Sequence, residues 1–415
     1  AENMRLQPIW QMGRREVYDA FYDTEYEMPQ RITEGVFTRA VYSKKQLFER
    51  MIDFWRDHFS ISDEIDYPIE LLLFEKNVLA KHALGNFRDL LIAASRHPAM
   101  LVYLDNFVSD KQAPNENFAR ELLELHTLGV DGDYSEADIR EIARAFTGWT
   151  IHTGTRDGFF FDEEMHDSDE KMILGKRFPA GRGIEEGLHI LSMLARHPDT
   201  ARFMSTKLCT RFVADRPPLS IIESTTQVWL DTDGDIKSIL RHIFRSAEFY
   251  AAAGKKYMRP FEYVVAMFRA TGNRVYNWYA LEEMLLRLGQ YPHGWHPPNG
   301  YPDVAGAWIN TGGLLNRWNA AMTITHETHE DVYSSWGILS RLLDGLNEPQ
   351  TAGELVDQIA TRLWGKPISG PARTQFVNYV ADGAGENVPM TPRLFSQKMA
   401  STYGLMLASP TFQWR

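Results

Sequence analysis

The stretch Pro114–Gly129, PNENFARELLELHTLG, decides how the chain is interpreted, because its apolar residues recur at the spacing of an α-helix. A step of about 100° per residue places its leucines, phenylalanine and alanine on one broad arc. The complementary sector is expected to face solvent and holds Glu116, Asn117, Arg120, Glu124 and Thr127. The stretch therefore predicts an amphipathic helix that ends near its final glycine.

Two polar residues of this stretch fall on the apolar arc. Glu121 lies among the leucines, and His126 lies between Leu122 and Ala119. A buried carboxylate is costly unless it is paired, so Glu121 is expected either in a functional site or in a buried ion pair. A histidine on an apolar arc is more often a satisfied core residue than a ligand. The two side chains are about 140° apart, so each needs a partner from elsewhere in the chain.

The same periodicity recurs along most of the 415 residues and predicts a mostly α, multi-helix globular domain. Residues 150–185 are punctuated by glycine, aspartate and proline, and residues 290–313 are rich in proline, glycine and aromatic residues, so both are expected to be long irregular segments. The first has room for a small β-hairpin. We expect a helical part at 1–149, the loop at 150–185, and a second helical part at 186–415 that packs with the first as one compact unit.

Three local signals predict where helices begin or break. Ser43 is expected to cap a helix over 43–59. A helix over 86–106 is expected to break near Pro98, because proline disfavours helical geometry at the residue before it. Ser135 and the acidic residue three positions later form a capping-box pattern for the next helix.

The overall composition excludes several classes of function. A formal net charge of −11 disfavours nucleic acid as a partner, because phosphate binding needs a basic surface. No apolar run reaches the roughly 20 residues that would span a bilayer. Cys209 is the single cysteine, so neither an intrachain disulfide nor a site of several thiolates is possible.

Candidate partners for Glu121 and His126 lie in two other places. His58 closes the segment FWRDHF, and His166 and Asp167 lie in the first irregular loop, with Lys171 nearby. Sets of histidine and carboxylate can hold a divalent metal or perform acid–base catalysis. The chain contains no H-E-x-x-H or P-loop pattern that would choose between these chemistries.

The blocks FWRDHF, NENFARELLELHTLGVDGDYSEADIREIARAFTGWT and HDSDEKMILG resemble a bacterial family catalogued as domain of unknown function eighteen-hundred. The later HPDTARFMSTKLCTRFV and LGQYPHGWHPPNGYPDVAGAWIN are similar to its remaining blocks. The resemblance covers roughly residues 43 to 320. Two departures are a short initial helical segment and the lack of a glycine at 168–170. The block with His293 and His296 is atypical, so the resemblance assigns no site there.

The resemblance implies a mostly helical, exported protein. Members of this family are often encoded beside a second family that looks sulfatase-like, which implies a periplasmic or secreted role in polysaccharide or envelope metabolism. The start of this chain, AENMRLQPIW, contains no signal-peptide pattern. The family pattern also includes Asn115, Glu116 and Arg120, so the polar face of the opening helix is expected to meet a ligand or the loop that carries His166.

Two functional hypotheses follow. The first is a hydrolase or lyase that acts on a polysaccharide or another envelope polymer by acid–base chemistry, metal-assisted or not. Its candidate acid–base residues are Glu121, Glu116, His126, His58, His166 and Asp167. Its candidate substrate-binding residues are Arg120, Asn115, Trp149, Trp55 and Lys171, with the two indoles as stacking platforms. The second hypothesis is a non-catalytic binding or assembly protein working with a sulfatase-like partner, in which the same polar residues form a structural network.

Overall fold

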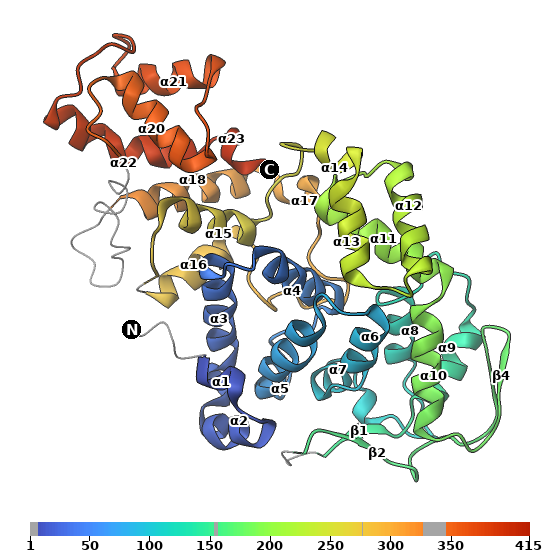
Figure 1. Cartoon of the computed structure of the whole chain (residues 1–415). Coiled ribbons are helices and arrows are strands. Elements are labelled where there is room, and N and C mark those ends of the chain that lie inside the picture. The colour runs from blue at the N-terminus through green and yellow to red at the C-terminus, as the bar shows by residue number, and fades with distance from the viewer. Residues whose placement is uncertain (1–6, 153–156, 276, 327–345) are drawn as a thin grey trace. The chain divides into compact units, whose positions relative to one another are not determined.

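A computed structural model describes residues 7–152, 157–275, 277–326 and 346–415 (Figure 1). Residues 153–156 of the expected first loop lie outside this part of the chain. The structure is 63% helical, and its described strands form two short antiparallel hairpins. The prediction of a mostly α fold is therefore confirmed.

The chain forms two compact units, which divide near residue 253 rather than at the segment 150–185. The first contains residues 1–39, 43–252 and 292–302, and the second contains 40–42, 253–291 and 303–415. The irregular stretch expected at 290–313 is thus shared between them. All the candidate site residues named above belong to the first unit.

The first unit is built from helices joined by short turns. Its helices are α1 (Gln7–Gln11), α2 (Arg14–Phe21), α3 (Met28–Tyr42, whose last residues belong to the second unit), α4 (Gln46–Phe59), α5 (Pro68–Phe74), α6 (Phe87–Ser95), α7 (Pro98–Tyr103), α8 (Glu116–Glu124), α9 (Glu136–Ala145), α10 (Ile184–Ala195), α11 (Pro198–Phe212), α12 (Leu219–Asp231), α13 (Ile236–Arg245) and α14 (Ala247–Ala251). A π-helix, η3 (Glu75–Ala80), continues α5, and 3-10 turns lie at η2 (Tyr22–Glu27) and η4 (Asn106–Val108).

The second unit is described as helices alone. They are α15 (Pro260–Thr271), α16 (Trp278–Leu288), α17 (Ala305–Trp308), α18 (Thr311–Thr325), α20 (Ala352–Trp364), α21 (Gly370–Val380), α22 (Pro392–Ala408) and α23 (Pro410–Gln413). Helix α18 packs along α22, and α20 packs against α21.

The residues of α4 show why the first unit folds as it does. Met51, Trp55 and Phe59 recur every four residues and are at most 1% exposed, so one stripe of the helix lies in the core. The Trp55 indole also donates from Nε1 to the carbonyl of Ala83, which satisfies its polar atom. Full burial of side chains of this size stabilises the fold by about 1.5–3 kcal/mol each.

Two of the three predicted helix signals are confirmed. The chain breaks between α6 and α7, where His97 caps α7 by accepting from the backbone of Ala99. Ser135 begins α9 with a reciprocal capping box. The predicted start at Ser43 is wrong, because α4 begins at residue 46 and the Ser43 hydroxyl accepts from the backbone of Lys45 in the preceding turn.

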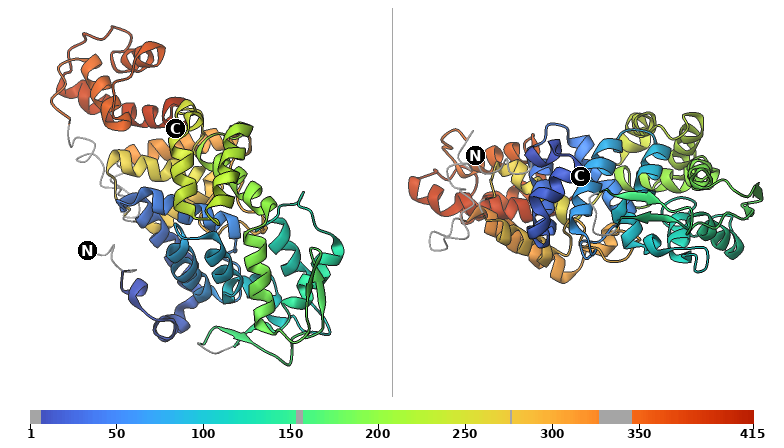
Figure 2. Two further views of the ribbon diagram at one scale, coloured as in Figure 1. Left: turned by 45° about the vertical axis from the view of Figure 1, so that its right-hand side comes forward. Right: turned by 90° about the horizontal axis from the view of Figure 1, so that it is seen from below.

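The segment after α9 contains two hairpins where one was expected. Strand β1 (Trp149–Ile151) pairs with β2 (Phe159–Phe161), and β3 (Lys171–Ile173) pairs with β4 (Lys176–Phe178). Strand β3 packs against α9, and α9 packs against α10. The further views in Figure 2 show the hairpins beside α10. Strands β1 and β3 therefore anchor the two hairpins to the helices.

The opening helix is shorter than its periodicity predicts. Helix α8 stops at Glu124, and the following residues leave helical geometry. The expectation that Thr127 faces solvent is wrong, because this residue is fully buried and its hydroxyl donates to the carbonyl of Leu122. His126 is buried as expected, but it reaches the core from the turn after the helix rather than from the helix face.

Candidate functional site

His58 and His126 meet in the core of the first unit. Their ring centroids are 5.6 Å apart at an interplanar angle of 69°, and the residues are 1% and 3% exposed. Lys207 on α11 places Nζ 3.0 Å from Nδ1 of His58. Nε2 of His58 and both ring nitrogens of His126 have no partner at full hydrogen-bonding geometry within the described part of the chain, although each ring also interacts with the backbone of the other residue, which is the smallest of the effects on its pKa. We call these three residues the histidine pair site.

Both imidazoles are held in the neutral form. Burial, and after it the charge of Lys207, lowers the pKa of His126 to about 3. Burial also places the pKa of His58 well below its usual value, again with Lys207 as the next cause. A neutral ring offers one N–H donor and one lone pair, so the two rings keep hydrogen-bonding capacity beyond the contact with Lys207.

The backbone beside the histidine pair site is unusual in three places. Ser60, which ends α4, has a φ of +43°, and His293 has a φ of +62°. Both are non-glycine residues in the left-handed region, which costs of order 1 kcal/mol or more. The π-helix η3 begins at Glu75. Such strained residues and π-turns are concentrated at functional sites.

A second buried cluster connects these strained positions. His293 contacts the carbonyl of Ile61 through Nδ1 at 2.8 Å and the carboxylate of Glu75 through Nε2 at 3.0 Å. Arg56 contacts the same carboxylate at 2.5 and 3.1 Å. Burial alone would raise the pKa of Glu75, but Arg56 and His293 hold it far below its usual range. This carboxylate is fully paired and is best explained as structural.

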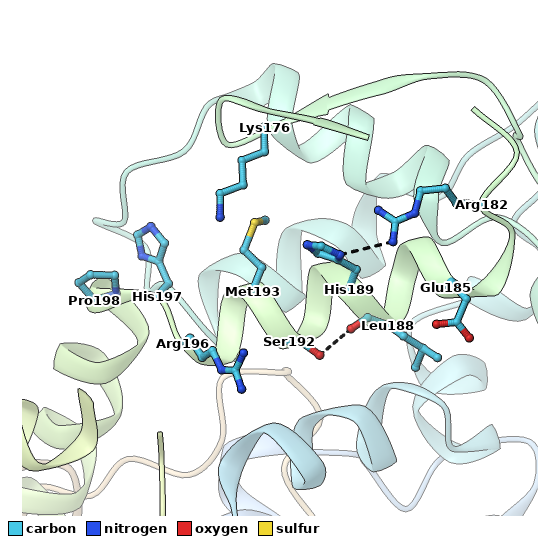
Figure 3. Close-up of a pocket in the computed structure, with 10 residues that line it drawn as sticks. All are labelled: Lys176, Arg182, Glu185, Leu188, His189, Ser192, Met193, Arg196, His197 and Pro198. Atoms are coloured by element: carbon cyan, nitrogen blue, oxygen red, sulfur yellow. Dashed lines mark hydrogen bonds between the residues drawn. The ribbon is translucent and has the colours of Figure 1, made fainter. Parts of the chain in front are cut away.

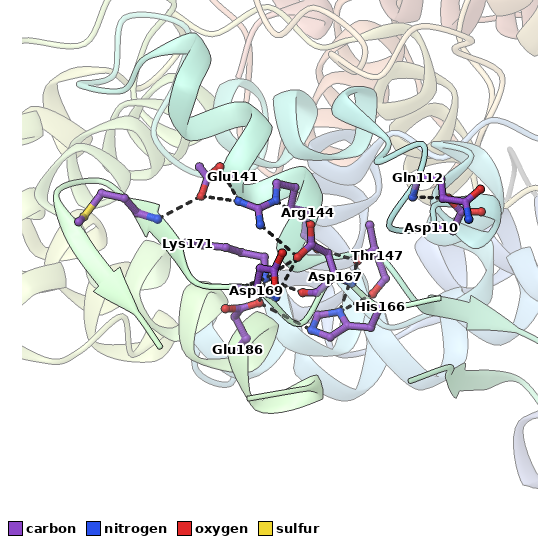
Figure 4. Close-up of polar contacts among 11 residues, drawn as sticks. Asp110, Gln112, Glu141, Arg144, Thr147, His166, Asp167, Asp169, Lys171 and Glu186 are labelled. Atoms are coloured by element: carbon purple, nitrogen blue, oxygen red, sulfur yellow. Dashed lines mark hydrogen bonds and ion pairs between the residues drawn. The ribbon is translucent and has the colours of Figure 1, made fainter. Parts of the chain in front are cut away.

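His166, Asp167 and Lys171 converge as the sequence suggested, and they do so around an unpredicted residue, Glu186 (Figure 4). Nζ of Lys171 lies 2.9 Å from the Glu186 carboxylate and donates to the carbonyls of Asp167 and Asp169 at 2.6 and 2.9 Å. Nε2 of His166 is 3.8 Å from the same carboxylate. These residues, with Arg144, form what we call the loop network.

Arg144 closes the loop network on its outer side. Its guanidinium binds both carboxylate oxygens of Asp167, at 2.7 and 3.1 Å, and also contacts Glu141. Burial would raise the pKa of Asp167, but Arg144 keeps it below the usual range. Thr147 completes the network, because its backbone carbonyl accepts a hydrogen bond from Nδ1 of His166 at 2.9 Å. The loop network therefore fastens residues 166–171 to α9 and α10.

The substrate-binding role expected for Lys171 is not supported by this geometry. The residue is 1% exposed, and its ammonium is enclosed by Glu186 and two carbonyls. An ammonium in this position is fully used within the protein and cannot also reach a ligand. His166 and Asp167 are engaged in the same network, so we interpret all three as structural.

Glu121 stands apart from both clusters. It is half-buried, and its Oε2 has no hydrogen-bond partner among the described residues. Burial raises the pKa of this carboxyl, and the neighbouring charge of Glu124 raises it further. The charge of Glu121 in turn adds to the effect of burial on Tyr103, whose pKa rises to about 12. Glu121 is thus a half-buried carboxyl whose pKa is raised.

The other polar residues of the opening stretch have structural partners. Asn115 caps α8, since its side chain accepts from the backbone of Phe118 and donates to the carbonyl of Leu104. Arg120 forms a bidentate ion pair with Glu136 at 2.9 and 2.8 Å on the surface. Glu116 is exposed, 4.0 Å from the same guanidinium. Periodicity assigned this polar face of α8 to solvent. In the structure it contacts α9 through the ion pair between Arg120 and Glu136.

Trp55 and Trp149 do not provide the expected stacking platform. Both side chains are 0% exposed. Trp149 packs edge-on against Phe146 and Phe159, and its ring lies so close to Gly187 that a Cβ there would meet it at 2.5 Å. A ring enclosed on both faces cannot also stack on a sugar.

The donor set for a metal ion is incomplete. In the described ranges, no group of three or more His, Cys, Asp or Glu side chains lies close enough to hold a metal ion. The two imidazoles of the histidine pair site could supply two ligands, but the Lys207 ammonium beside them opposes a second cation. These residues therefore do not fit the metal-assisted version of the first hypothesis.

Sequence reasoning missed Lys207 and Glu186, although the position of each among the apolar residues of its helix could have indicated it. Glu186 falls four and eight residues before Ile190 and Leu194 on the apolar stripe of α10, as Glu121 does on α8. Lys207 directly precedes the buried Leu208 in a segment whose apolar pattern was interpreted as core. His293 was set aside because its block departs from the family pattern.

The family model described as "Protein of unknown function (DUF1800)" matches residues 3–414, and the chain belongs to that family. The resemblance expected for residues 43 to 320 thus extends over essentially the whole chain. Comparison with curated proteins and with solved structures finds no match. In the described residues, no helix combines the length and apolar character needed to cross a membrane.

Proposed function

We propose that this protein is an exported hydrolase or lyase that acts on a polysaccharide or another envelope polymer, with acid–base chemistry at His58 and His126. The observation that carries this proposal is the pair of adjacent, buried imidazoles in which Nε2 of His58 and both ring nitrogens of His126 have no partner at full hydrogen-bonding geometry among the described residues. A buried polar group without a partner costs about 1–3 kcal/mol, so its presence in a core requires an explanation. Use in chemistry is one such explanation.

The geometry supports different roles for the two rings. Lys207 fixes the tautomer of His58 by donating to Nδ1, which leaves Nε2–H as a hydrogen-bond donor. The neutral His126 offers a lone pair as a proton acceptor. Negative charge that enters or develops beside the pair would be stabilised by Lys207 and would raise the pKa of both rings towards neutrality. Glu121, with its raised pKa, is the candidate for the acid, and it would have to act on the polymer from outside the histidine pair.

Access to the pair is most direct from the side of Lys207. This lysine is partly exposed, whereas both histidines are buried. We propose that the reacting group of the polymer reaches the rings past Lys207 as the neighbouring side chains of α11 shift. The export and the class of substrate rest on what the family resemblance implies, and on the net charge of −11, which disfavours nucleic acid.

The test is product release from a panel of purified bacterial polysaccharides by the wild-type protein and two variants, His58→Gln and His126→Gln. Each variant is expected to lose activity by at least about a hundredfold, the usual scale of acid–base catalysis. His82→Gln is the matched control, because His82 belongs to the same unit and to neither cluster. Full activity in both variants would reject the assignment.

A non-catalytic binding or assembly protein is the second candidate, and the loop network favours it. The buried charges of this network are paired with one another, as expected of groups that fix helix packing. The two candidates differ at Glu121. A role in catalysis predicts that Glu121→Gln keeps its stability and loses activity, whereas a structural role predicts a lower melting temperature.

A further inference from the structure

A pocket of about 600 Å³ lies along one face of α10 (Figure 3). This volume is within the range of roughly 300–1,000 Å³ that small-molecule sites occupy. None of its lining residues belongs to the histidine pair site or to the loop network. The pocket is therefore a separate feature of the first unit.

The pocket follows the helical repeat of α10. The lining residues from this helix and its C-terminal cap are spaced by three or four positions, which places them on one face: Glu185, Leu188, His189, Ser192, Met193 and Arg196. Lys176 at the start of β4 and Arg182 before the helix extend over this face from the hairpin side. From residue 185 to residue 196 the face is about 16 Å long.

The charges in the pocket are unbalanced. Three permanent cations, Lys176, Arg182 and Arg196, line it together with one carboxylate, Glu185. Figure 3 shows Glu185 at the end of the row, away from Lys176. In a protein with a net charge of −11, such a local excess of positive charge is a property of this site and not of the surface as a whole.

Two of these cations are available to a ligand. Arg196 is committed to Asp233, which it contacts at 2.7 and 2.9 Å. Within the described part of the chain, neither Lys176 nor Arg182 forms an ion pair with a carboxylate. Arg182 instead lies over the ring of Phe178 at 5.6 Å and points one nitrogen at Nδ1 of His189, 3.4 Å away.

The pKa of His189 is consistent with two cations beside the pocket. Burial lowers the pKa of its ring, and the charges of Arg182 and Lys176 lower it further. The two cations therefore act on the same space, and an anion there would meet both of them.

We propose that this pocket binds an acidic oligosaccharide, whose carboxylate or sulfate groups contact Lys176 and Arg182. Leu188 and Met193 supply apolar contacts for the C–H groups of sugar rings. This inference goes beyond the proposed function, because binding here does not require a reactive histidine pair.

The experiment is calorimetric titration of the whole chain with three tetrasaccharides at low ionic strength. Tetragalacturonate supplies carboxylates, a heparin-derived tetrasaccharide supplies sulfates, and cellotetraose is neutral. Binding is expected for at least one acidic sugar and not for cellotetraose. Lys176→Gln and Arg182→Gln, each measured separately, should weaken binding by about tenfold or more, because each removes a charge-assisted contact.

Arg177→Gln is the matched control. Arg177 is adjacent to Lys176 on the same strand, is exposed, and pairs with Glu170 at 2.6 Å outside the pocket. Its loss should change the affinity by less than about twofold. The inference is overturned if no acidic sugar binds, if cellotetraose binds equally well, if all three variants weaken binding alike, or if single-stranded DNA binds more tightly than the sugars. Since no turnover is measured, these outcomes are independent of the proposed catalysis.

Discussion

The ammonium nitrogen of Lys207 lies 3.0 Å from Nδ1 of His58, and this contact fixes the protonation of the ring. An ammonium group can only donate, so His58 accepts at Nδ1 and its neutral ring carries the proton on Nε2. That nitrogen has no partner at full hydrogen-bonding geometry among the described residues, and the ring that carries it lies 5.6 Å from the ring of His126. The contact that runs from Lys207 on α11 into the core thus ends at the histidine pair.

Replacing Lys207 with methionine should raise the pKa of both histidines. Burial is the larger cause of their lowered pKa values and remains in the variant, but the Coulomb repulsion from the ammonium is lost. Titration of the histidine ring signals by NMR measures the change. Arg202→Met, which removes an exposed charge from the same helix, should leave both titrations as they are. An unchanged pKa of His126 in the Lys207 variant would show that its ammonium does not act on the pair.

The free energy of unfolding should decrease as the pH is lowered below about 6.5, where these histidines become protonated in the unfolded chain. The folded pKa of His126 is about 3 and the unfolded value is about 6.5, so the unfolded state binds more protons between them. Its contribution is therefore complete above about pH 6.5 and is lost as the pH falls towards 3.

Urea unfolding between about pH 6.5 and pH 5 tests this, because most carboxylates remain ionised there. His126→Leu should reduce the slope of unfolding free energy against pH by up to about 1.4 kcal/mol per pH unit. Equal slopes for the variant and the wild type would mean that His126 is protonated in the folded protein.

The loop network should respond as a structural element. Lys171→Met leaves the Glu186 carboxylate buried without its nearest cation and should lower the free energy of unfolding by about 3–5 kcal/mol. The double variant Lys171→Met, Glu186→Leu should recover part of this loss, because no charge is then left unpaired. The control is Arg177→Gln at an exposed pair, with an expected loss below about 1 kcal/mol. A Lys171 variant as stable as that control would contradict the structural assignment.

Asn115 and Arg120 should differ in their effect on stability, although both belong to the family pattern. Asn115→Ala removes the cap of α8 and a second hydrogen bond to Leu104, and should cost about 1–2 kcal/mol. Arg120→Ala removes exposed ion pairs and should cost less than about 1 kcal/mol. Chemical denaturation of the two variants compares them directly. If Arg120→Ala were the more destabilising change, the surface assignment of its ion pairs would be wrong.

The sequence was sufficient for the fold class because helical periodicity and capping are local properties. The break before Pro98 and the capping box at Ser135 were predicted for this reason. The early end of α8 was not predicted, because the apolar spacing continues past Glu124 although the helix stops there. Thr127 was consequently placed on the wrong side of the chain.

The site was predicted only in part, because partners distant in sequence cannot be read from spacing. His58 and His126 were both singled out, and so were the loop residues 166, 167 and 171. Their division into an unsatisfied pair and a paired network depends on Lys207 and Glu186, which come from two other helices. The burial of Trp55 and Trp149 likewise depends on neighbours that no local pattern reveals.

The central claim is that the histidine pair is kept for its chemistry at a cost in stability, and the melting temperature of His126→Leu tests it most directly. Leucine removes two ring nitrogens that have no partners and leaves the contact between His58 and Lys207 in place. Relief of an unsatisfied polar group worth about 1–3 kcal/mol should raise the melting temperature by a few degrees, at about 2–4 °C per kcal/mol. His126→Met, with a more adaptable side chain, should do the same. A lower melting temperature in both variants would contradict the account and would make His126 a structural residue.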